Sequence, residues 1–270
     1  MSEEIVAIVT GASRGVGKGI ALGLGEAGAT VYVTGRSETE GSVPGTIGQT
    51  AAEVSALGGR GIAHRCDHAD DAQTEALVRR VLDEQGRIDV LVNNAFAIPE
   101  GQVIGKFWEL PIAQWDLMTT VGLRSHFVAS ALVAPSMIAR KKGLIVNVSS
   151  FGAKVYAISV AYGVGKAGVD RMSRDMAREL APHGVTALSI WPGIVRTERL
   201  SIEPERLGYD PKGGESPTFS GRAVAALAKD PNVIAKSGKP WVVAELAQEY
   251  GFTDVDGSQP VSMRRPEKVG

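Results

Sequence analysis

Short apolar runs alternate along this chain with longer segments of helical periodicity, and this alternation constrains the fold more than any other feature. The apolar runs are residues 5–9, 31–33, 61–64, 89–92, 144–148, 185–190 and 241–243. Helical patterns lie between them, at residues 16–27, 50–57, 73–84, 112–140, 160–181 and 221–228. Apolar strands without polar alternation indicate a parallel sheet buried on both faces, and the intervening helices predict right-handed βαβ units. We therefore expect an α/β fold, with a single doubly wound domain over residues 1–270 and a parallel sheet of about seven strands between two layers of helices.

The composition argues against several classes of protein. The 270-residue chain has a formal net charge of -1, which gives no indication of the basic surface that binds nucleic acid. Cys66 is the only cysteine, so an intrachain disulfide is excluded and a reducing compartment fits. The acidic start does not resemble a signal peptide, and no uninterrupted apolar run reaches the roughly 18 residues of a membrane span. We expect a soluble, cytoplasmic protein with no nucleic-acid or membrane partner.

Residues 10–17, with the sequence TGASRGVG, join the first apolar run to a helical pattern. Gly11, Gly15 and Gly17 let the backbone turn tightly and approach a pyrophosphate, which the free N–H groups at the start of the following helix would bind. The alternative is a glycine-rich turn without a ligand. The position between a strand and a helix favours a dinucleotide site of the Rossmann type.

The end of the second apolar run bears on the choice of cofactor. An acidic residue about 20 positions beyond the glycine loop would accept the ribose 2′-OH of NAD, but the chain reads VTGR at residues 33–36. Arg36 and Arg14 can each pair with a 2′-phosphate, because a guanidinium binds phosphate through two parallel donors. Either arginine could instead be a solvated surface residue. The two arginines, with the acid missing, favour NADP(H).

Tyr162 and Lys166 lie four residues apart in a helical pattern, so they share one face of the helix. A nearby ammonium favours the phenolate form of a tyrosine, and a phenol tuned in this way can exchange a proton with an alcohol or a carbonyl. Ser149 and Ser150 end the preceding apolar run, where a hydroxyl could polarise a carbonyl. This combination points to proton transfer at a carbonyl or an alcohol.

Together these motifs resemble those of the short-chain dehydrogenase/reductase family, in its single-domain soluble branch. Residues 10–17 match the family's TGxxxGxG, residues 93–96 its NNAG with Phe96 in place of the last glycine, residues 147–150 its serine strand, residues 162–166 its YxxxK, and residues 192–197 its PG-x-V-x-T segment. Further stretches resemble one group of that family and extend the match nearly to the C-terminus, at residues 11–25, 29–36, 121–124, 191–197 and 250–257.

The resemblance implies an NADP(H)-dependent oxidoreductase that transfers hydride between the nicotinamide and a small-molecule carbonyl or alcohol substrate. Tyr162 would be the acid/base, a serine would orient the carbonyl, and Lys166 would assist the tyrosine and hold the nicotinamide ribose. The other cofactor contacts would come from Gly11, Ser13, Arg14, Gly15, Val16, Gly17 and Arg36 near the phosphates, Asp67 at the adenine, Asn94 and Ala95 along the middle, and Pro192, Gly193, Ile194 and Thr197 at the nicotinamide.

Two functions of other kinds are possible on the same fold. One is a non-catalytic nucleotide sensor or scaffold, which would have no need of the Tyr162–Lys166 pair. The other is an enoyl reductase, although those relatives place more residues between the tyrosine and the lysine. The intact pair favours the hydride-transferring enzyme that acts on carbonyls and alcohols.

Two positions matter because they depart from the family pattern or leave it ambiguous. Where the family has an asparagine that helps anchor a water relay to the lysine, this chain has Gly122, so the proton route must differ or run on solvent. The serine is ambiguous, because counting from Gly143 selects Ser150 and counting back 13 residues from Tyr162 selects Ser149. We favour Ser150, since strand register is held by pairing while a loop can lose a residue.

Three expectations concern the rest of the chain. The four histidines show no metal-ligand spacing, so we expect no metal site. Residues 198–219 lack periodicity and predict an irregular loop on the substrate side that acts as a mobile lid. Residues 112–140 and 160–181, which are rich in Ala, Val and Met, correspond to helices that commonly build the oligomer core in this family, so we expect a homodimer or homotetramer.

Overall fold

The computed structural model describes residues 4–208, 210 and 212–264, and its centre is one parallel sheet. The seven strands stand in the order β3-β2-β1-β4-β5-β6-β7. Their bounds are β1 Val6–Val9, β2 Thr30–Gly35, β3 Arg60–Arg65, β4 Val90–Asn93, β5 Gly143–Val148, β6 Val185–Trp191 and β7 Pro240–Val242. Each strand overlaps one of the apolar runs, which confirms the prediction of an α/β fold with a parallel sheet.

The strand order reverses between β1 and β4. From β1 the chain builds outward through β2 to β3, then crosses back to β4 and builds outward in the other direction to β7. In sheets of this kind, ligands bind beyond the carboxyl ends of the strands, at the point where the order reverses. The glycine loop follows β1 and Asn94 follows β4, so both lie at this point.

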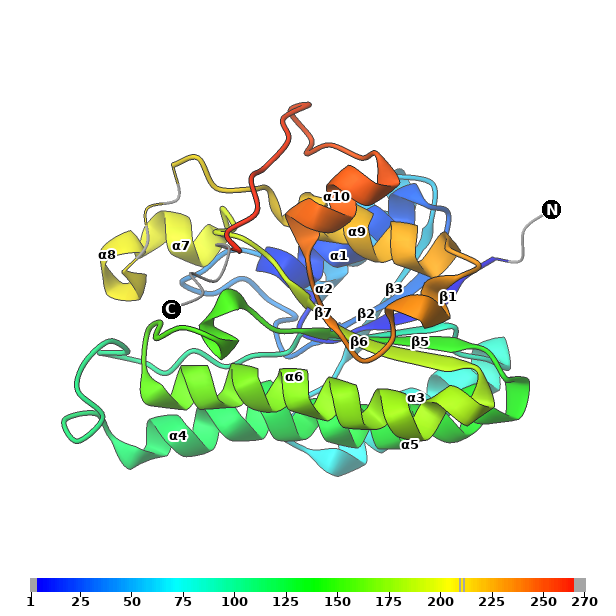
Figure 1. Cartoon of the computed structure of the whole chain (residues 1–270), viewed down its shortest axis with the longest axis horizontal. Coiled ribbons are helices and arrows are strands. Elements are labelled where there is room, and N and C mark those ends of the chain that lie inside the picture. The colour runs from blue at the N-terminus through cyan, green and yellow to red at the C-terminus, as the bar shows by residue number, and fades with distance from the viewer. Residues whose placement is uncertain (1–3, 209, 211, 265–270) are drawn as a thin grey trace, which may run out of the picture.

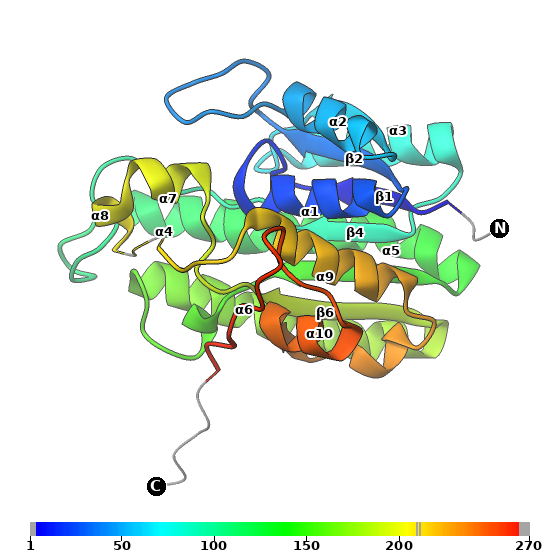
Figure 2. The same cartoon turned by 90° about the horizontal axis from the view of Figure 1, so that it is seen from above.

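Helices cover both faces of the sheet (Figures 1 and 2). One layer holds α1 (Gly15–Glu26), α2 (Ile47–Ala56), α9 (Pro217–Lys229) and α10 (Val243–Tyr250). The other holds α3 (Asp71–Gln85), α5 (Ser125–Arg140) and α6 (Val160–Leu180). Leu24 and Phe219 belong to the apolar core under the first layer, and Leu77 and Val133 to the core under the second. Apolar residues on both faces of the strands explain why the runs show no polar alternation.

The helical pattern at residues 112–140 forms one rod with a widened turn inside it. The rod consists of α4 (Ile112–Thr119), a π-helical segment η1 (Thr120–Arg124) and α5. Single π-helical turns within α-helices are frequent at functional sites, and this one contains Gly122. By length and composition alone, this rod could cross a membrane. We did not expect such a segment from the sequence, because polar residues interrupt the apolar run. Its buried residues, including Met137, pack against the sheet.

The segment of residues 198–219 is largely helical where the structure describes it, so the prediction of an irregular loop is wrong. It contains α7 (Glu198–Ile202) and α8 (Pro204–Leu207), and α9 begins at Pro217; positions 209 and 211 lie outside the described residues. Helices of five and four residues are too short to show a period in the sequence. A parallel bridge between Val195 and Glu215 brings the two ends of the segment together.

Helices α1 and α9 meet backbone to backbone. A Cβ atom on Gly19 would lie 2.0 Å from the carbonyl of Pro217, and one on Gly23 would lie 2.3 Å from the carbonyl carbon of Gly221. Real Cβ contacts are never this short, so both positions of α1 require glycine. The crossing holds the first turn of α9 against the helix that follows the glycine loop. Three short 3-10 helices complete the fold, η2 (Phe151–Ala153), η3 (Ala181–His183) and η4 (Val233–Lys236).

Candidate active site

Two adjoining cavities open beyond the carboxyl ends of the central strands. One, of about 490 Å³, contains Tyr162 and is lined mainly by apolar side chains, and we call it the apolar cavity. The other, of about 610 Å³, contains the glycine loop and Arg36, and we call it the polar cavity. Val16, Asn94, Phe96, Ile98 and Thr197 line both. A ligand with a polar half and a reactive half can therefore extend from one cavity into the other.

The glycine loop is held in one conformation by the end of β4. Gly11 and Gly15 have φ angles of 64° and 58°, in the left-handed region that favours glycine. The side-chain amide of Asn94 donates to the carbonyls of Thr10 and Gly11 at 2.9 and 3.0 Å. A Cβ on Gly17 would lie 2.3 Å from the same amide nitrogen. Asn94 thus shapes the loop from behind, a role that the motif alone does not reveal.

The start of α1 lies at the polar cavity and has no side-chain cap. Arg14 is the N-cap residue and its side chain makes no capping hydrogen bond. The N–H of Gly15 points away from the helix and donates to the carboxylate of Glu198 at 2.7 Å. A helix N-terminus that already holds one anionic group, with no capping side chain, fits the pyrophosphate of a dinucleotide. Sequence patterns gave no signal for Glu198, because it approaches from α7.

The two arginines expected at a 2′-phosphate differ in how freely they can act. Arg14 donates to the carbonyls of Pro44 and Gly45 at 3.0 and 2.7 Å and to Ser37 Oγ at 3.2 Å, so it holds the loop after β2. The side chain of Arg36 is 63% exposed at the rim of the polar cavity and lies 3.6 Å from the carboxylate of Asp67. Arg36 is therefore the better placed of the two to receive a phosphate, while Arg14 shapes the loop beside it.

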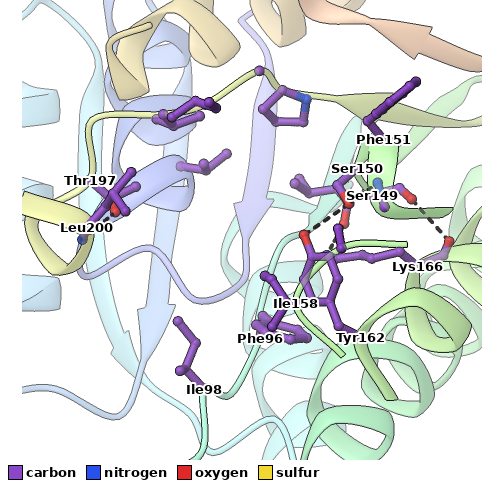
Figure 3. A pocket seen from close by; sticks show the side chains of 18 of the residues that line it. Phe96, Ile98, Ser149, Ser150, Phe151, Ile158, Tyr162, Lys166, Thr197 and Leu200 are labelled. Atoms are coloured by element: carbon purple, nitrogen blue, oxygen red, sulfur yellow. Dashed lines mark hydrogen bonds between the residues drawn. The ribbon is translucent and has the colours of Figure 1, made fainter. Parts of the chain in front are cut away.

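Tyr162, Ser150 and Lys166 come together at the floor of the apolar cavity (Figure 3). The Tyr162 hydroxyl donates to Ser150 Oγ at 3.0 Å. Ser149 is buried instead, and its hydroxyl donates to the backbone carbonyl of Lys166 at 3.1 Å. Of the two serines, Ser150 is the one whose hydroxyl contacts the phenol, and Ser149 connects α6 to the end of β5. This geometry supports the register counted from Gly143.

A strained turn sets the direction of α6. Ser159 caps the helix by accepting from the N–H of Tyr162 at 3.3 Å. Ile158, just before the cap, has a φ of 61°, and the N–H of Ser159 donates to the carbonyl of Ala157 at 2.7 Å. A γ-turn with a branched residue at positive φ is rare and strained, and such strain is found at functional sites. Here the turn places Ile158 in the wall of the apolar cavity and Tyr162 at its floor.

Lys166 is buried beneath the tyrosine. Its ammonium donates to the carbonyl of Val148 at 2.9 Å. Burial lowers the pKa of Lys166 to about 8, while the negative charge of Asp170 opposes that change. Asp170 is itself fixed by donors from Ser189 and the indole of Trp191. The pKa of Lys166 therefore lies close to neutral pH.

The position that departs from the family pattern is filled by an aromatic ring. A Cβ on Gly122 would lie 2.5 Å from Cδ2 of Phe96, so the ring packs directly on the glycine. The space that an asparagine side chain would need at position 122 is thus taken by Phe96, the other residue that departs from the family's motifs. We expected the proton route to differ or to run on solvent, and this stays a prediction. The structure places Gly122 inside the π-helical segment η1, with the Phe96 ring against it.

The remaining residues expected at a cofactor all line the two cavities. Ser13 and Asp67, with Ala95, line the polar cavity, and Val16 lies where the two cavities meet. Pro192, Gly193 and Ile194 line the apolar cavity, and Thr197 lines both. Asp67 accepts from the N–H of Ala69 at 3.0 Å, so its carboxylate is oriented by its own loop. No cluster of possible metal ligands occurs among the described residues.

Behind the segment 192–197, a buried carboxyl supports the chain. Glu215 is 4% exposed, and a Cβ on Gly193 would lie 2.8 Å from its Oε2 atom. Its backbone N–H donates to the carbonyl of Ile194 at 2.8 Å, and its own carbonyl accepts from Arg196. Burial raises the pKa of Glu215 to about 7, although a hydrogen bond from the Gly193 N–H opposes the rise. This support was not predicted, because it depends on pairing between distant segments.

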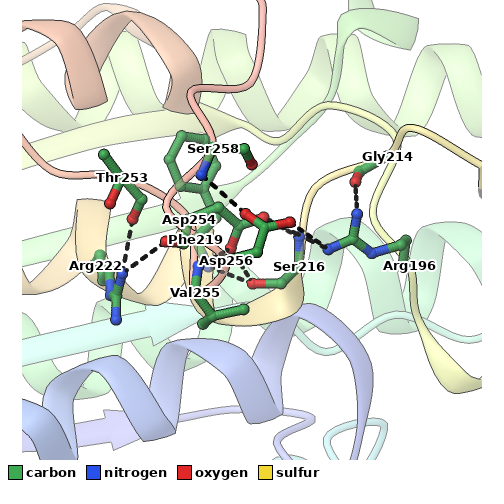
Figure 4. A network of polar contacts seen from close by, with 10 residues as sticks. All are labelled: Arg196, Gly214, Ser216, Phe219, Arg222, Thr253, Asp254, Val255, Asp256 and Ser258. Carbon is green, nitrogen blue, oxygen red and sulfur yellow. Dashed lines mark hydrogen bonds and ion pairs between the residues drawn. The ribbon is translucent and has the colours of Figure 1, made fainter.

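A network of polar contacts anchors the start of α9 to the C-terminal part of the chain (Figure 4). The buried carboxylate of Asp254 accepts from the N–H of Ser216 at 2.7 Å and from the Ser216 hydroxyl. Arg196 lies 3.8 Å from the same carboxylate, and Arg222 donates to the carbonyls of Thr253 and Asp254 at 2.8 and 3.1 Å. Residues 250–257, one of the stretches of the resemblance, thus fix the far end of the segment that begins with α7.

The rest of the apolar cavity comes from helices and loops that carry no motif. Its apolar lining includes Ile98, Val103, Met118, Val155, Ile158, Leu200 and Met263. Among the described residues around this cavity, Lys166 is the one charged side chain. Sequence patterns could not gather these residues, because they come from five separate parts of the chain.

Comparison with known proteins agrees with the site. A family model described as short chain dehydrogenase matches residues 5–206. The mouse and human proteins named dehydrogenase/reductase SDR family member 1 are 44% and 43% identical over 267 residues, which covers 93% of this chain and 83% of theirs. This confirms the resemblance of the outer stretches to that group. A variant of actinorhodin polyketide ketoreductase, solved with NADPH, is 27% identical with a TM-score of 0.77, covering 89% of this chain and 95% of that one.

Proposed function

The chain belongs to the short-chain dehydrogenase family, and from that premise we propose that it is an NADP(H)-dependent oxidoreductase that interconverts a carbonyl compound and an alcohol. The observation that carries the proposal is the contact of Tyr162 Oη with Ser150 Oγ at 3.0 Å, above the buried ammonium of Lys166. Because these two hydroxyls lie within hydrogen-bond distance of each other, both can bind the same carbonyl oxygen of a substrate in the cavity.

Each group has a distinct task in the reduction. The reduced nicotinamide, when bound, supplies a hydride to the carbonyl carbon. Ser150 donates a hydrogen bond to the carbonyl oxygen and so orients it. Tyr162 gives its hydroxyl proton to the same oxygen, which completes the alcohol. The positive charge of Lys166 stabilises the phenolate that Tyr162 becomes, and the phenolate later regains a proton.

The polar cavity supports NADP(H) as the cofactor. Arg36 lies exposed at its rim, and no acidic side chain ends β2 where NAD would need an acceptor for its ribose hydroxyl. The start of α1 offers the Gly15 N–H to the pyrophosphate, and Thr197 lies where the nicotinamide half would pass between the cavities. The ketoreductase with the similar fold was solved with NADPH.

The apolar cavity supports an uncharged, largely apolar substrate. Lys166 is the one charge among its described lining residues, and it is engaged with Val148 and beneath Phe96. A substrate carboxylate or phosphate would therefore lose its hydration there without gaining a partner, which is costly. Ketones and aldehydes with aliphatic or aromatic groups fit the lining.

The test is to measure the reduction of a panel of apolar ketones and aldehydes through the loss of NADPH absorbance. Tyr162→Phe keeps the ring and removes the proton, and it should lower turnover by at least about 100-fold while NADPH still binds. Tyr156→Phe is the matched control, because Tyr156 lines the same cavity but is 73% exposed. Ser150→Ala should lower turnover much more than Ser149→Ala. Unchanged turnover in Tyr162→Phe would leave the non-catalytic sensor as the better interpretation.

Further parts of our expectation stay predictions. They are the homo-oligomeric state, the cytoplasmic location and the absence of nucleic-acid and membrane partners. The role of residues 198–219 as a lid is also still a prediction. Its support is that Thr197, the N-cap residue of α7, lines both cavities.

A further inference from the structure

The ring of Phe96 touches three parts of the site at once. Its centroid lies 4.9 Å from Nζ of Lys166 and 5.7 Å from the ring of Tyr162, with the two ring planes at 89°. The ring also lies against Gly122 of the π-helical segment η1. Phe96 follows β4 and lines both cavities, so it stands where they meet.

Gly122 is what gives the ring this place. A Cβ at position 122 would lie 2.5 Å from Cδ2 and 2.8 Å from Cε2 of Phe96, so any other residue would force the ring away. Lys166 and Tyr162 pack on the same ring, so a displaced ring would lose its present contacts with both. Phe96 and Gly122 therefore form a matched pair, and neither can change alone without disturbing the catalytic residues.

The contacts act on the two catalytic residues in different ways. The ammonium of Lys166 donates one proton to Val148 and faces the ring with its charge, and an aromatic face attracts a cation without hydrating it. The perpendicular contact with Tyr162 is the edge-to-face arrangement that aromatic pairs favour. Burial pushes the pKa of Lys166 down to about 8, so an attraction that favours the charged form matters at neutral pH.

We propose that Phe96, admitted by Gly122, is a positioning residue that keeps Lys166 charged and in place under Tyr162 and shields it from water on the η1 side. The proton that Tyr162 loses is then replaced from the cavity side, since the ring closes the route past Gly122. This proposal rests on the proposed function only where it concerns turnover. Its effect on Lys166 can be measured without any substrate.

The first experiment follows the titration of Lys166 by NMR in protein labelled with ¹³C at the Cε atoms of lysine. The resonance is assigned by its loss in Lys166→Met. Phe96→Leu keeps an apolar side chain but removes the aromatic face, so the midpoint should fall by about half a pH unit to one unit. Phe96→Ala should admit water and raise the midpoint instead. Phe107→Leu is the control, because Phe107 is exposed, pairs with Trp108 and lines neither cavity, and it should leave the midpoint unchanged.

The second experiment tests the match between the two positions by thermal unfolding. Gly122→Ala should lower the melting temperature in the parent protein, because its Cβ collides with the ring. In the Phe96→Ala background the same change should cost far less, since the colliding atoms are gone. An equal loss in both backgrounds, or a Lys166 midpoint that Phe96→Leu does not move, would overturn the proposal.

Turnover supplies a separate readout. With a good carbonyl substrate, Phe96→Leu should lower kcat about 10-fold with a smaller change in KM, because a misplaced proton donor affects the chemical step. If the parent protein reduces no carbonyl compound, the proposed function fails, while the titration and unfolding experiments still decide the role of Phe96.

Discussion

Glu198 occupies the place where an anion should bind, and replacing it should strengthen cofactor binding. Its carboxylate accepts from the Gly15 N–H at 2.7 Å, at the uncapped start of α1. A pyrophosphate at this helix terminus needs the same donor. The cofactor must therefore displace the carboxylate of Glu198 from the Gly15 N–H. The displaced carboxylate stays close by, and its negative charge repels the pyrophosphate.

The size of the effect follows from that one contact. A hydrogen bond to a charged group contributes about 1.5–3 kcal/mol, and partial exposure of Glu198 brings this down to about 1–2 kcal/mol. Glu198→Gln removes the charge and keeps the size of the side chain. NADPH should then bind about 10-fold more tightly, since each 1.4 kcal/mol is tenfold in affinity.

Calorimetric titration measures this, and two controls isolate the cause. Glu205→Gln makes the same change of charge on the exposed surface of the same segment and should leave the affinity unchanged. Adenosine 2′-phosphate carries no pyrophosphate, so Glu198→Gln should not improve its binding. Equal or weaker NADPH binding by Glu198→Gln, or an equal gain for adenosine 2′-phosphate, would refute the reasoning.

Arg36→Asp should weaken NADPH binding by about 10- to 100-fold and favour NADH, because it removes a charged donor and adds a ribose acceptor; titration with both cofactors checks this, and an unchanged preference contradicts it. The pKa of Glu215 is about 7 in the folded protein against an ordinary 4.5, so between these pH values only the unfolded chain loses this proton. The free energy of unfolding should therefore fall by up to about 3 kcal/mol as pH rises across that window. Urea unfolding should show a smaller fall in Glu215→Gln, and a parent protein whose stability does not fall would contradict a buried, protonated Glu215. Gly23→Ala should lower the free energy of unfolding by at least about 1–3 kcal/mol, because its Cβ overpacks the helix crossing. Gly165→Ala, whose Cβ meets nothing within 4 Å, should raise it by about 0.5–1 kcal/mol in the same assay. Equal effects of the two changes would refute the close approach of α1 and α9. Light scattering should give the mass of a dimer or tetramer, because Phe127 and Val164 on α5 and α6 are 57% and 46% exposed, and a monomer at micromolar concentration would contradict this.

The sheet and the tyrosine–lysine pair could be predicted because local patterns encode them. Strands such as residues 144–148 are buried on both faces, so their apolar runs are uninterrupted. Tyr162 and Lys166 need only one helix to share a face. The choice between Ser149 and Ser150 could not be settled in the same way, since it depends on which hydroxyl turns toward Tyr162 once β5 and α6 pack together.

The parts that sequence reasoning missed all depend on contacts between distant segments. Glu198 reaches Gly15 across 183 positions of the chain. Phe96 and Gly122 each stood out as departures from a pattern, but their compensation is visible only where the loop after β4 meets η1. The short helices α7 and α8 left no period to detect. Prediction thus succeeded where one element determines the geometry and failed where two elements share it.

The crossing of α1 and α9 without intervening side chains also decides where this chain can tolerate changes of length. Gly19 and Gly23 bind the glycine loop and the first turn of α9 into one unit, so an insertion at residues 216–222 would displace the nucleotide end as well. The stretch between Thr197 and Ser216 has both ends fixed, by its cap and bridge on one side and by Asp254 on the other. If Glu215 is kept as the support of residues 192–197, the rest of that stretch can be exchanged for one of another length while the catalytic residues stay where they are. We therefore predict that exchanging this one segment alters the part of the apolar cavity that Leu200 lines, while Tyr162 and Lys166 stay in place.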